Sequence, residues 1–130
     1  MKPNEKKARS LYSKLVRVKG CLNTTGTAEF GKCFTCGRVF PFEVLQCGHF
    51  VSGRTSALFF EPTNAHIQCP ECNCTKGGNL EIYHEKMIRK YGEKEVERLE
   101  SMRHKIIKMY ESDYRELVSK FQSEFESIEY

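Results

Sequence analysis

The chain has 130 residues, of which 39% are hydrophobic and 29% charged, and its mean hydropathy is −0.56. This balance predicts one soluble domain. No apolar run is long enough to cross a bilayer or to form a signal-peptide core, so we exclude a membrane protein and expect a cytoplasmic one. The net charge of +4 is concentrated in residues 1–79, whereas residues 80–130 have an acidic excess. The basic part favours a polyanionic partner, nucleic acid first.

A basic amphipathic helix is predicted over residues 5–19, where apolar side chains recur at helical spacing, and Gly20 is expected to end it. Its basic side chains are either DNA contacts or ordinary solvated charges. Residues 23–27 are polar and typical of a loop. The apolar stripe consists of Ala8, Leu11, Tyr12, Leu15 and Val18, and the candidate DNA contacts are Lys6, Lys7, Arg9, Lys14 and Arg17.

Short, irregular strands are expected over residues 40–50, where β-forming residues are interrupted by Pro41 and Gly48. Residues 52–63 have the character of a loop. Residues 64–69 predict a further strand, which leads directly into a turn.

The last part of the chain has a helical pattern. Asn79 is the expected N-cap of a helix over residues 80–91, which Gly92 ends. A second helix is expected from about Glu93 and a third after an N-cap at Ser112, and the segment between these two either joins or breaks them. The inward-facing residues of these two helices are expected to be Val96, Leu99, Met102, Tyr114, Leu117, Val118, Phe121, Phe125 and Ile128.

Two cysteine pairs have the same spacing, Cys33-x-x-Cys36 and Cys69-x-x-Cys72. Four thiolates suit a tetrahedral zinc without an open position, so we predict a structural Zn²⁺ whose binding energy stabilises the fold. An odd total of seven cysteines in a reducing cytosol argues against disulfides. A redox pair is the weaker alternative, because no βαβ pattern accompanies either pair. Cys74 is expected to be a bystander.

The segment between the two cysteine pairs, residues 37–68, is longer than the spacing of an ordinary zinc ribbon. It contains His49, Asn64 and His66. A rigid metal anchor at both ends of such a segment is one way for a small domain to hold catalytic groups in place.

The pattern of Gly48-His49, Asn64-x4-Cys69 and Asn73 directly after the second cysteine pair resembles the HNH, or ββα-metal, nucleases. The resemblance implies an α+β fold with a zinc-anchored ββα-metal core. Its parts would be a basic helix and loop at 1–31, the core at 32–92 and a helical extension at 93–130, together one nuclease domain.

A longer run of matching residues is similar to the NinG, or Rap, family of phage recombination proteins. These residues are Gly48-His49-Phe50, Asn64 to Cys69, Cys72-Asn73 and Gly78-Asn79-Leu80. The resemblance implies a phage or prophage endonuclease in a bacterial host, acting on branched DNA such as Holliday junctions and D-loops with Mg²⁺ or Mn²⁺. Phage recombination proteins are possible partners, and symmetric cutting of a four-way junction would favour a homodimer.

In this interpretation His49 is the general base and a neighbour of the divalent cation, and Asn64 orients its ring. Asn73 binds the cation through its amide oxygen. Arg54 and Lys76 contact phosphate. Each of these residues also has a structural alternative: a hydrogen-bonded strand histidine, turn asparagines that bond local backbone, or solvated surface charges.

The sequence departs from the family pattern beside the base, because Gln46 and Gly48 occupy positions where a carboxylate or a second histidine is expected. His66 is the preferred replacement as a ligand of the catalytic cation, with Glu61 second and Cys47 last, since thiolates favour zinc over Mg²⁺.

Two other classes of protein remain. A non-catalytic zinc module that binds DNA explains the thiols and the charge, but not the asparagine after the second cysteine pair. A protein-interaction adaptor rests on the apolar stripe of the last helix, and such a stripe is more often core than interface.

Overall fold

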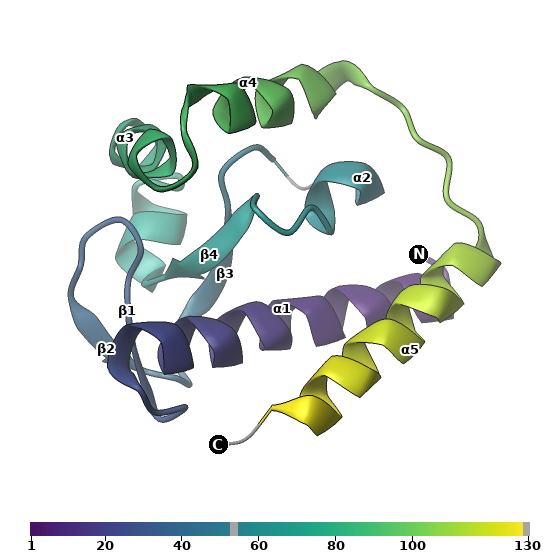
Figure 1. Cartoon of the computed structure of the whole chain (residues 1–130), viewed down its shortest axis with the longest axis horizontal. Helices are drawn as coiled ribbons and strands as arrows, with labels where there is room; N and C mark the ends of the chain where they lie inside the picture. The colour runs from purple at the N-terminus through teal and green to yellow at the C-terminus, as the bar shows by residue number, and fades with distance from the viewer. Residues whose placement is uncertain (53–54, 129–130) are drawn as a thin grey trace.

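The computed structural model describes residues 1–52 and 55–128 and has an α+β architecture, as the sequence predicts (Figure 1). Strands β1 and β2 form one antiparallel pair, and β3 and β4 form another, with His49 opposite Ala65 and Gln46 opposite Gln68. The helices are α1 (Pro3–Thr25), α2 (Ser56–Phe59), α3 (Leu80–Tyr91), α4 (Glu93–Ser101) and α5 (Glu111–Ser127). The strands are β1 (Phe30–Lys32), β2 (Val39–Pro41), β3 (Gln46–His49) and β4 (Ala65–Gln68). Two single turns are η1 (Glu71–Thr75) and η2 (Met102–His104).

Helix α1 is longer than the sequence predicts. It continues through Gly20 and three residues of the expected loop, and ends at Gly26, whose φ of 81° is left-handed. Gly20 instead allows α1 and β4 to approach closely, because a Cβ there would lie 2.6 Å from Cγ2 of Ile67. The predicted apolar stripe is confirmed: Ala8, Tyr12, Leu15 and Val18 are buried.

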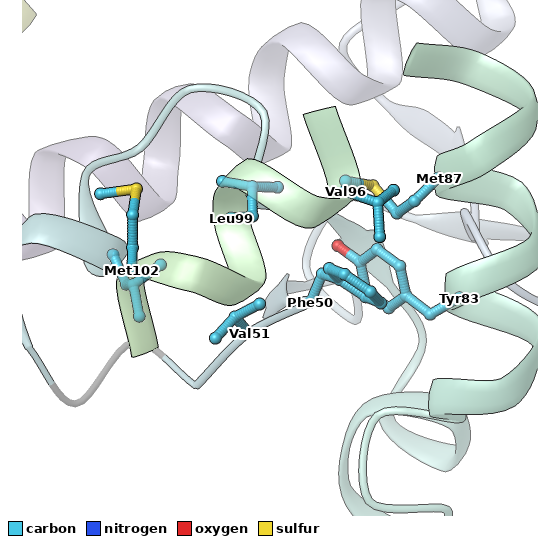
Figure 2. Packing of buried hydrophobic residues seen from close by; sticks show 8 residues of the cluster. Phe50, Val51, Tyr83, Met87, Val96, Leu99 and Met102 are labelled. Atoms are coloured by element: carbon cyan, nitrogen blue, oxygen red, sulfur yellow. The ribbon is translucent and has the colours of Figure 1, made fainter. Parts of the chain in front are cut away.

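One apolar core joins the β3–β4 pair to α3 and α4 (Figure 2). Tyr83 and Met87 from α3 are fully buried, and the Tyr83 ring lies 5.3 Å from the ring of Phe50, just after β3. Val96 and Leu99 from α4 close this core, together with Met102. The predicted inward-facing residues of α4 are therefore confirmed, whereas Leu80, at the start of α3, is exposed.

A single helical turn, α2, interrupts the segment predicted to be a loop. The hydroxyl of Thr55 accepts a hydrogen bond from the backbone N–H of Leu58 at 3.5 Å and caps this turn. Leu58 is buried in the core beneath it. The apolar side chains of this segment thus pack into the core, and their burial stabilises the single turn of α2.

Helix α5 lies along α1 (Figure 1) and buries Tyr114, Val118 and Phe121 against it. Its cap is Tyr110, whose backbone N–H donates to the Asp113 carboxylate at 2.7 Å, and not the expected Ser112. An extended segment over residues 105–110 separates η2 from α5. The segment between the second and third predicted helices therefore interrupts them and does not join them. In the described ranges, no helix combines the length and apolar character of a membrane span.

Candidate metal centre and histidine sites

Four thiols converge at one end of the molecule. Cys33 and Cys36 lie in the turn between β1 and β2, and Cys69 and Cys72 lie where β4 passes into η1. All four Sγ atoms are within 4.8 Å of one another, and those of Cys36 and Cys69 are 3.9 Å apart. A tetrahedral zinc with bonds of about 2.3 Å needs S···S separations of about 3.8 Å. The predicted four-cysteine cluster is therefore confirmed, and it can bind a metal such as zinc.

Hydrogen-bond donors already surround these sulfur atoms. The backbone N–H of Cys69 donates to Cys33 Sγ at 3.3 Å, and the Asn79 amide donates to Cys72 Sγ at 3.6 Å. Burial raises the pKa of Cys33, but bonds from the Cys36 backbone and the Thr35 hydroxyl outweigh it and bring this pKa down to about 6. Because the thiolate is the ligand form, this lowered pKa favours Cys33 as a metal ligand near neutral pH. Burial instead raises the pKa of Cys69 to about 12, so this thiol loses its proton when a metal binds. Asn79 thus contacts the cluster instead of capping α3 through its side chain.

The other three cysteines lie outside the cluster as free thiols: Cys21 is buried, Cys47 is half-buried and Cys74 is exposed. Cys74 Sγ donates to Gln46 Oε1 at 3.2 Å. Burial raises the pKa of Cys47 to about 12, so it is a neutral thiol that packs against α1. The expectation that Cys74 is a bystander to the metal cluster agrees with this placement.

His49 ends strand β3 and is held in one tautomer. Its Nε2 lies 3.0 Å from the carbonyl oxygen of Phe59. A carbonyl only accepts, so Nε2 carries the proton and Nδ1 keeps its lone pair. The ring packs against Phe59 and Tyr12, with centroids 4.6 and 6.4 Å away. Burial lowers the pKa of His49, the hydrogen bond to the Phe59 carbonyl partly offsets this, and nearby Arg9 lowers it further, which favours the neutral ring at physiological pH.

Asn64 does not contact the His49 ring, which corrects the expected direct orientation. Its side chain is fully buried and bonds backbone on both sides of the β3–β4 connection. Oδ1 accepts from Val51 N–H at 2.9 Å, and Nδ2 donates to the carbonyls of Val51 and Leu58 at 2.9 and 3.0 Å. Leu58 immediately precedes Phe59, whose carbonyl holds His49. Asn64 therefore acts on His49 through the backbone, because its amide satisfies otherwise unpaired buried groups.

His66 cannot serve as the expected metal ligand, because both ring nitrogens are engaged. Tyr83 donates its hydroxyl proton to the Gly48 carbonyl at 2.7 Å and therefore accepts from Nδ1 of His66 at 2.9 Å. Nε2 of His66 in turn accepts from the Tyr91 hydroxyl at 2.7 Å. Burial and then Lys90 lower the pKa of His66 to about 3. The structural alternative holds for this residue.

Asn73 and His49 are not brought together by the structure. The Asn73 amide donates to Gln46 Oε1 at 2.8 Å, at the first residue of β3, whereas His49 is the last residue of that strand. Side chains alternate along a strand, so Gln46 and His49 point to opposite faces. His49, Asn73 and His66 therefore do not form the expected ligand set. The sequence could have shown this separation, because residues 46 and 49 are an odd number of positions apart and their side chains therefore lie on opposite faces of a strand.

No second cluster of three or more histidine, cysteine or acidic ligands exists in residues 1–52 and 55–128 besides the four cysteines. Glu61, the second choice as a ligand, forms an ion pair with Arg98 at 2.5 Å. The ligand set expected for a catalytic Mg²⁺ or Mn²⁺ is thus not assembled among the described residues. Arg54, predicted to contact phosphate, lies outside the described residues.

The predicted DNA contacts of α1 divide into two groups. Lys6, Lys7 and Lys14 are exposed, as is Lys76 near the cysteine cluster, and Lys14 Nζ also lies 5.3 Å from the ring centroid of Phe125. Arg9 and Arg17 instead lie over aromatic rings, with guanidinium carbons 4.4 Å from the centroid of Phe59 and 4.8 Å from that of Phe42. Planar guanidinium groups stack well on such rings, so these two arginines serve packing within the protein.

Sequence reasoning missed the groups that fix the two histidines. The partner of His49 is a backbone carbonyl, which no side-chain pattern can reveal. The partners of His66 are Tyr83 and Tyr91, which share one face of α3. Their helical spacing was a usable signal, but only the packing of α3 on β4 brings them to that histidine.

The fold and the thiols define a class: a small α+β domain with two antiparallel strand pairs, built around a four-cysteine cluster that can bind a metal such as zinc. Within that class, the chain belongs to the NinG family, because the family model described as "Bacteriophage Lambda NinG protein" matches residues 2–130. The predicted resemblance to this family is therefore confirmed.

Two relatives define the extent of the likeness. The chain is 30% identical over 100 residues to "Protein ninG" of Escherichia phage 933W, an alignment that covers 74% of this chain and 47% of that protein. It is 36% identical over 73 residues to "Protein ninG" of Escherichia phage lambda, covering 53% of this chain and 34% of that protein. The chain thus matches less than half the length of either relative. No solved structure matches it.

Proposed function

We propose that this protein is a metal-dependent DNA endonuclease of the HNH type. Its substrates would be branched recombination intermediates such as Holliday junctions and D-loops. The observation that carries the proposal is the state of His49: a neutral imidazole at the end of β3, with Nε2 bonded to the Phe59 carbonyl and Nδ1 left as the basic atom. The chain also belongs to the NinG family of phage proteins, and the resemblance to that family is what implies this substrate.

The chemistry assigned to His49 is general base catalysis. Nδ1 accepts a proton from water while the water oxygen bonds to phosphorus, and the bond from phosphorus to the leaving oxygen breaks. Asn64 is a positioning residue, because it ties the backbone at Val51 and Leu58 next to the carbonyl that holds His49. The exposed Lys76 and the α1 lysines, with Arg54, would hold phosphates as cations.

The divalent cation remains part of the proposal. When bound, Mg²⁺ or Mn²⁺ would stabilise negative charge on the scissile phosphate. The described residues do not supply the ligand set expected for it, and no step above depends on it. The zinc cluster has a separate role, because four thiolates leave no open position for substrate.

The decisive experiment compares His49→Ala with His84→Ala, a matched control on α3 whose ring is exposed and lies 3.7 Å from Glu100. Both are assayed on linear, forked and four-way DNA with Mg²⁺ or Mn²⁺, alongside zinc analysis. We expect His49→Ala to lower the cutting rate by roughly 10²–10⁴-fold, with zinc content unchanged and the control unaffected. Equal cutting by wild type and His49→Ala would refute the assignment of the base.

The pH profile gives an independent check. Because the pKa of His49 is lowered by burial, its Nδ1 stays unprotonated below the ordinary histidine range. The cutting rate should therefore persist as pH falls through 6.5 and decline only at more acidic pH. A decline centred above pH 6.5 would point to a different base.

A second candidate is a zinc-containing DNA-binding module without catalysis. The observation that favours it is the engagement of Asn73 and His66 within the protein, away from any shared cation. DNA binding that equals wild type in His49→Ala, with no cutting by either protein in either metal, would establish this candidate.

A further inference from the structure

A lysine-lined pocket opens between α1, the β1–β2 turn and α3. Its volume is about 340 Å³, within the size range of small-ligand sites. Lys19 comes from α1, Lys32 from β1, and Lys86 and Lys90 from α3. Phe34 and Tyr91 form part of its wall.

The charged side chains that line this pocket are all positive. Its described lining includes four lysines and neither aspartate nor glutamate. Lys19 is paired with Glu124 at 2.9 Å, whereas Lys32, Lys86 and Lys90 make no ion pair with any described residue. Lys86 and Lys90 are one helical turn apart, a like-charge spacing that weakens a helix. An anion between these lysines would relieve that repulsion.

An aromatic platform lies beside the lysines. Phe34 stacks on His66 with ring centroids 4.1 Å apart and planes inclined by 19°. His66 is itself fixed by Tyr83 and Tyr91, so the Phe34 ring is held in place. Lys90 Nζ lies 5.8 Å from the Phe34 centroid and 5.4 Å from that of Tyr91. A flexible lysine over a fixed ring can move aside for a planar ligand.

We infer that this pocket binds one unpaired nucleotide of a DNA strand, with its base on Phe34 and its phosphate among Lys32, Lys86 and Lys90. A fixed aromatic ring stacks any base, and lysines follow the backbone charge. A base within a duplex cannot enter a concave pocket without leaving its stack, so the site selects unpaired nucleotides. The inference rests on the proposed function only in taking DNA as the partner, and it does not require cleavage.

The test uses the zinc-loaded full chain and the fluorescence anisotropy of labelled oligo-dT and of a blunt duplex. Lys86→Ala/Lys90→Ala removes two pocket charges, and Lys105→Ala/Lys108→Ala removes two from the exposed segment before α5. We expect the pocket variant to lose about tenfold in affinity for oligo-dT, more than for duplex, and to lower the salt dependence of oligo-dT binding. The control variant should weaken both ligands slightly and equally.

Phe34→Leu tests the platform while keeping an apolar side chain beside Cys33. We expect about a fivefold loss of oligo-dT affinity with zinc content and thermal melting unchanged. Unaltered oligo-dT binding in Phe34→Leu, or equal losses in the two double variants, would overturn the inference. Competition by dTMP as tight as that by oligo-dT would assign the pocket to a free nucleotide instead.

The same proteins separate the two proposals. If oligo-dT binding depends on the pocket but no DNA is cut, the nuclease fails and the pocket stands. If branched DNA is cut in a His49-dependent manner while the pocket variants bind normally, the nuclease stands and the pocket fails.

Discussion

The two ends of the molecule are stabilised in different ways. Around the cysteine cluster the buried side chains are small or polar, including Thr35 and Gln68. Along α1 and α5, large apolar side chains such as Tyr12, Val118 and Phe121 pack together. We therefore expect a bound metal to contribute most of the stability of the first region, and apolar burial most of that of the second.

This difference also separates the two histidines. His49 lies on the α1 side, against Tyr12 and Phe59, and keeps one free nitrogen among the described contacts. His66 lies on the α3 side, where two tyrosine hydroxyls occupy both nitrogens. The two histidines lie on neighbouring strands and yet differ in chemistry. Their hydrogen-bond partners come from segments packed against the strands, and not from the strands themselves.

Removing one thiol should have the largest effect. We expect Cys69→Ser to lose zinc and the ordered structure of the cysteine region, since structural zinc contributes about 10–16 kcal/mol in small zinc domains. Cys74→Ser, whose thiol is exposed and outside the cluster, is the control and should keep zinc. Elemental analysis and circular dichroism measure both effects. Full zinc occupancy in Cys69→Ser would contradict the four-thiolate site.

Truncation of the helical region should destabilise the protein without releasing metal. Phe121→Ala removes a buried ring between α5 and α1 and should lower the free energy of unfolding by about 3 kcal/mol. Gln122→Ala, on the exposed face of the same helix, should change little. Denaturant melts with zinc analysis are the measurement. Loss of zinc in folded Phe121→Ala would show that the two regions are one cooperative unit.

The His66 network predicts a pH dependence of stability. The folded pKa is about 3, below the ordinary histidine value of 6.5, so the unfolded chain binds the proton first as pH falls. Stability is unaffected above pH 6.5 and decreases between pH 6.5 and 3, by up to about 2 kcal/mol at pH 5. His66→Gln should lack this component in urea melts of zinc-loaded protein. Identical pH slopes in both proteins would exclude His66 as the titrating group.

The contact between the two regions at Gly20 should give the smallest effect. Gly20→Ala places a methyl against Ile67, but alanine also favours the helix, so we expect a net loss of about 1 kcal/mol. Thermal melting of Gly20→Ala, Ile67→Ala and the double variant measures the coupling. Additive losses would mean that the two residues do not meet.

Local patterns were sufficient for much of the fold. The cysteine spacing predicts the cluster, and helical periodicity predicts the buried faces of α1, α4 and α5. The errors occur where a residue responds to a distant neighbour. Gly20 lies within α1, where it leaves room for Ile67, and Tyr110 caps α5 through Asp113 where Ser112 was expected.

The candidate site was less predictable. His49, Asn64, His66 and Asn73 were selected by residue type and spacing, which carry no information about which face of a strand meets which helix. The structure pairs Asn73 with Gln46, His66 with two tyrosines and His49 with a backbone carbonyl. Each partner comes from another element of the fold.

The sequence by itself determined the family, the four metal-binding thiols and the apolar faces of the helices, because these depend on composition and on short, regular spacing. Only the tertiary structure decided which imidazole keeps an available nitrogen and where lysines from α1, β1 and α3 surround a pocket. Hydrogen bonds and converging charges depend on distances between segments remote in sequence, and those distances exist only once the chain is packed.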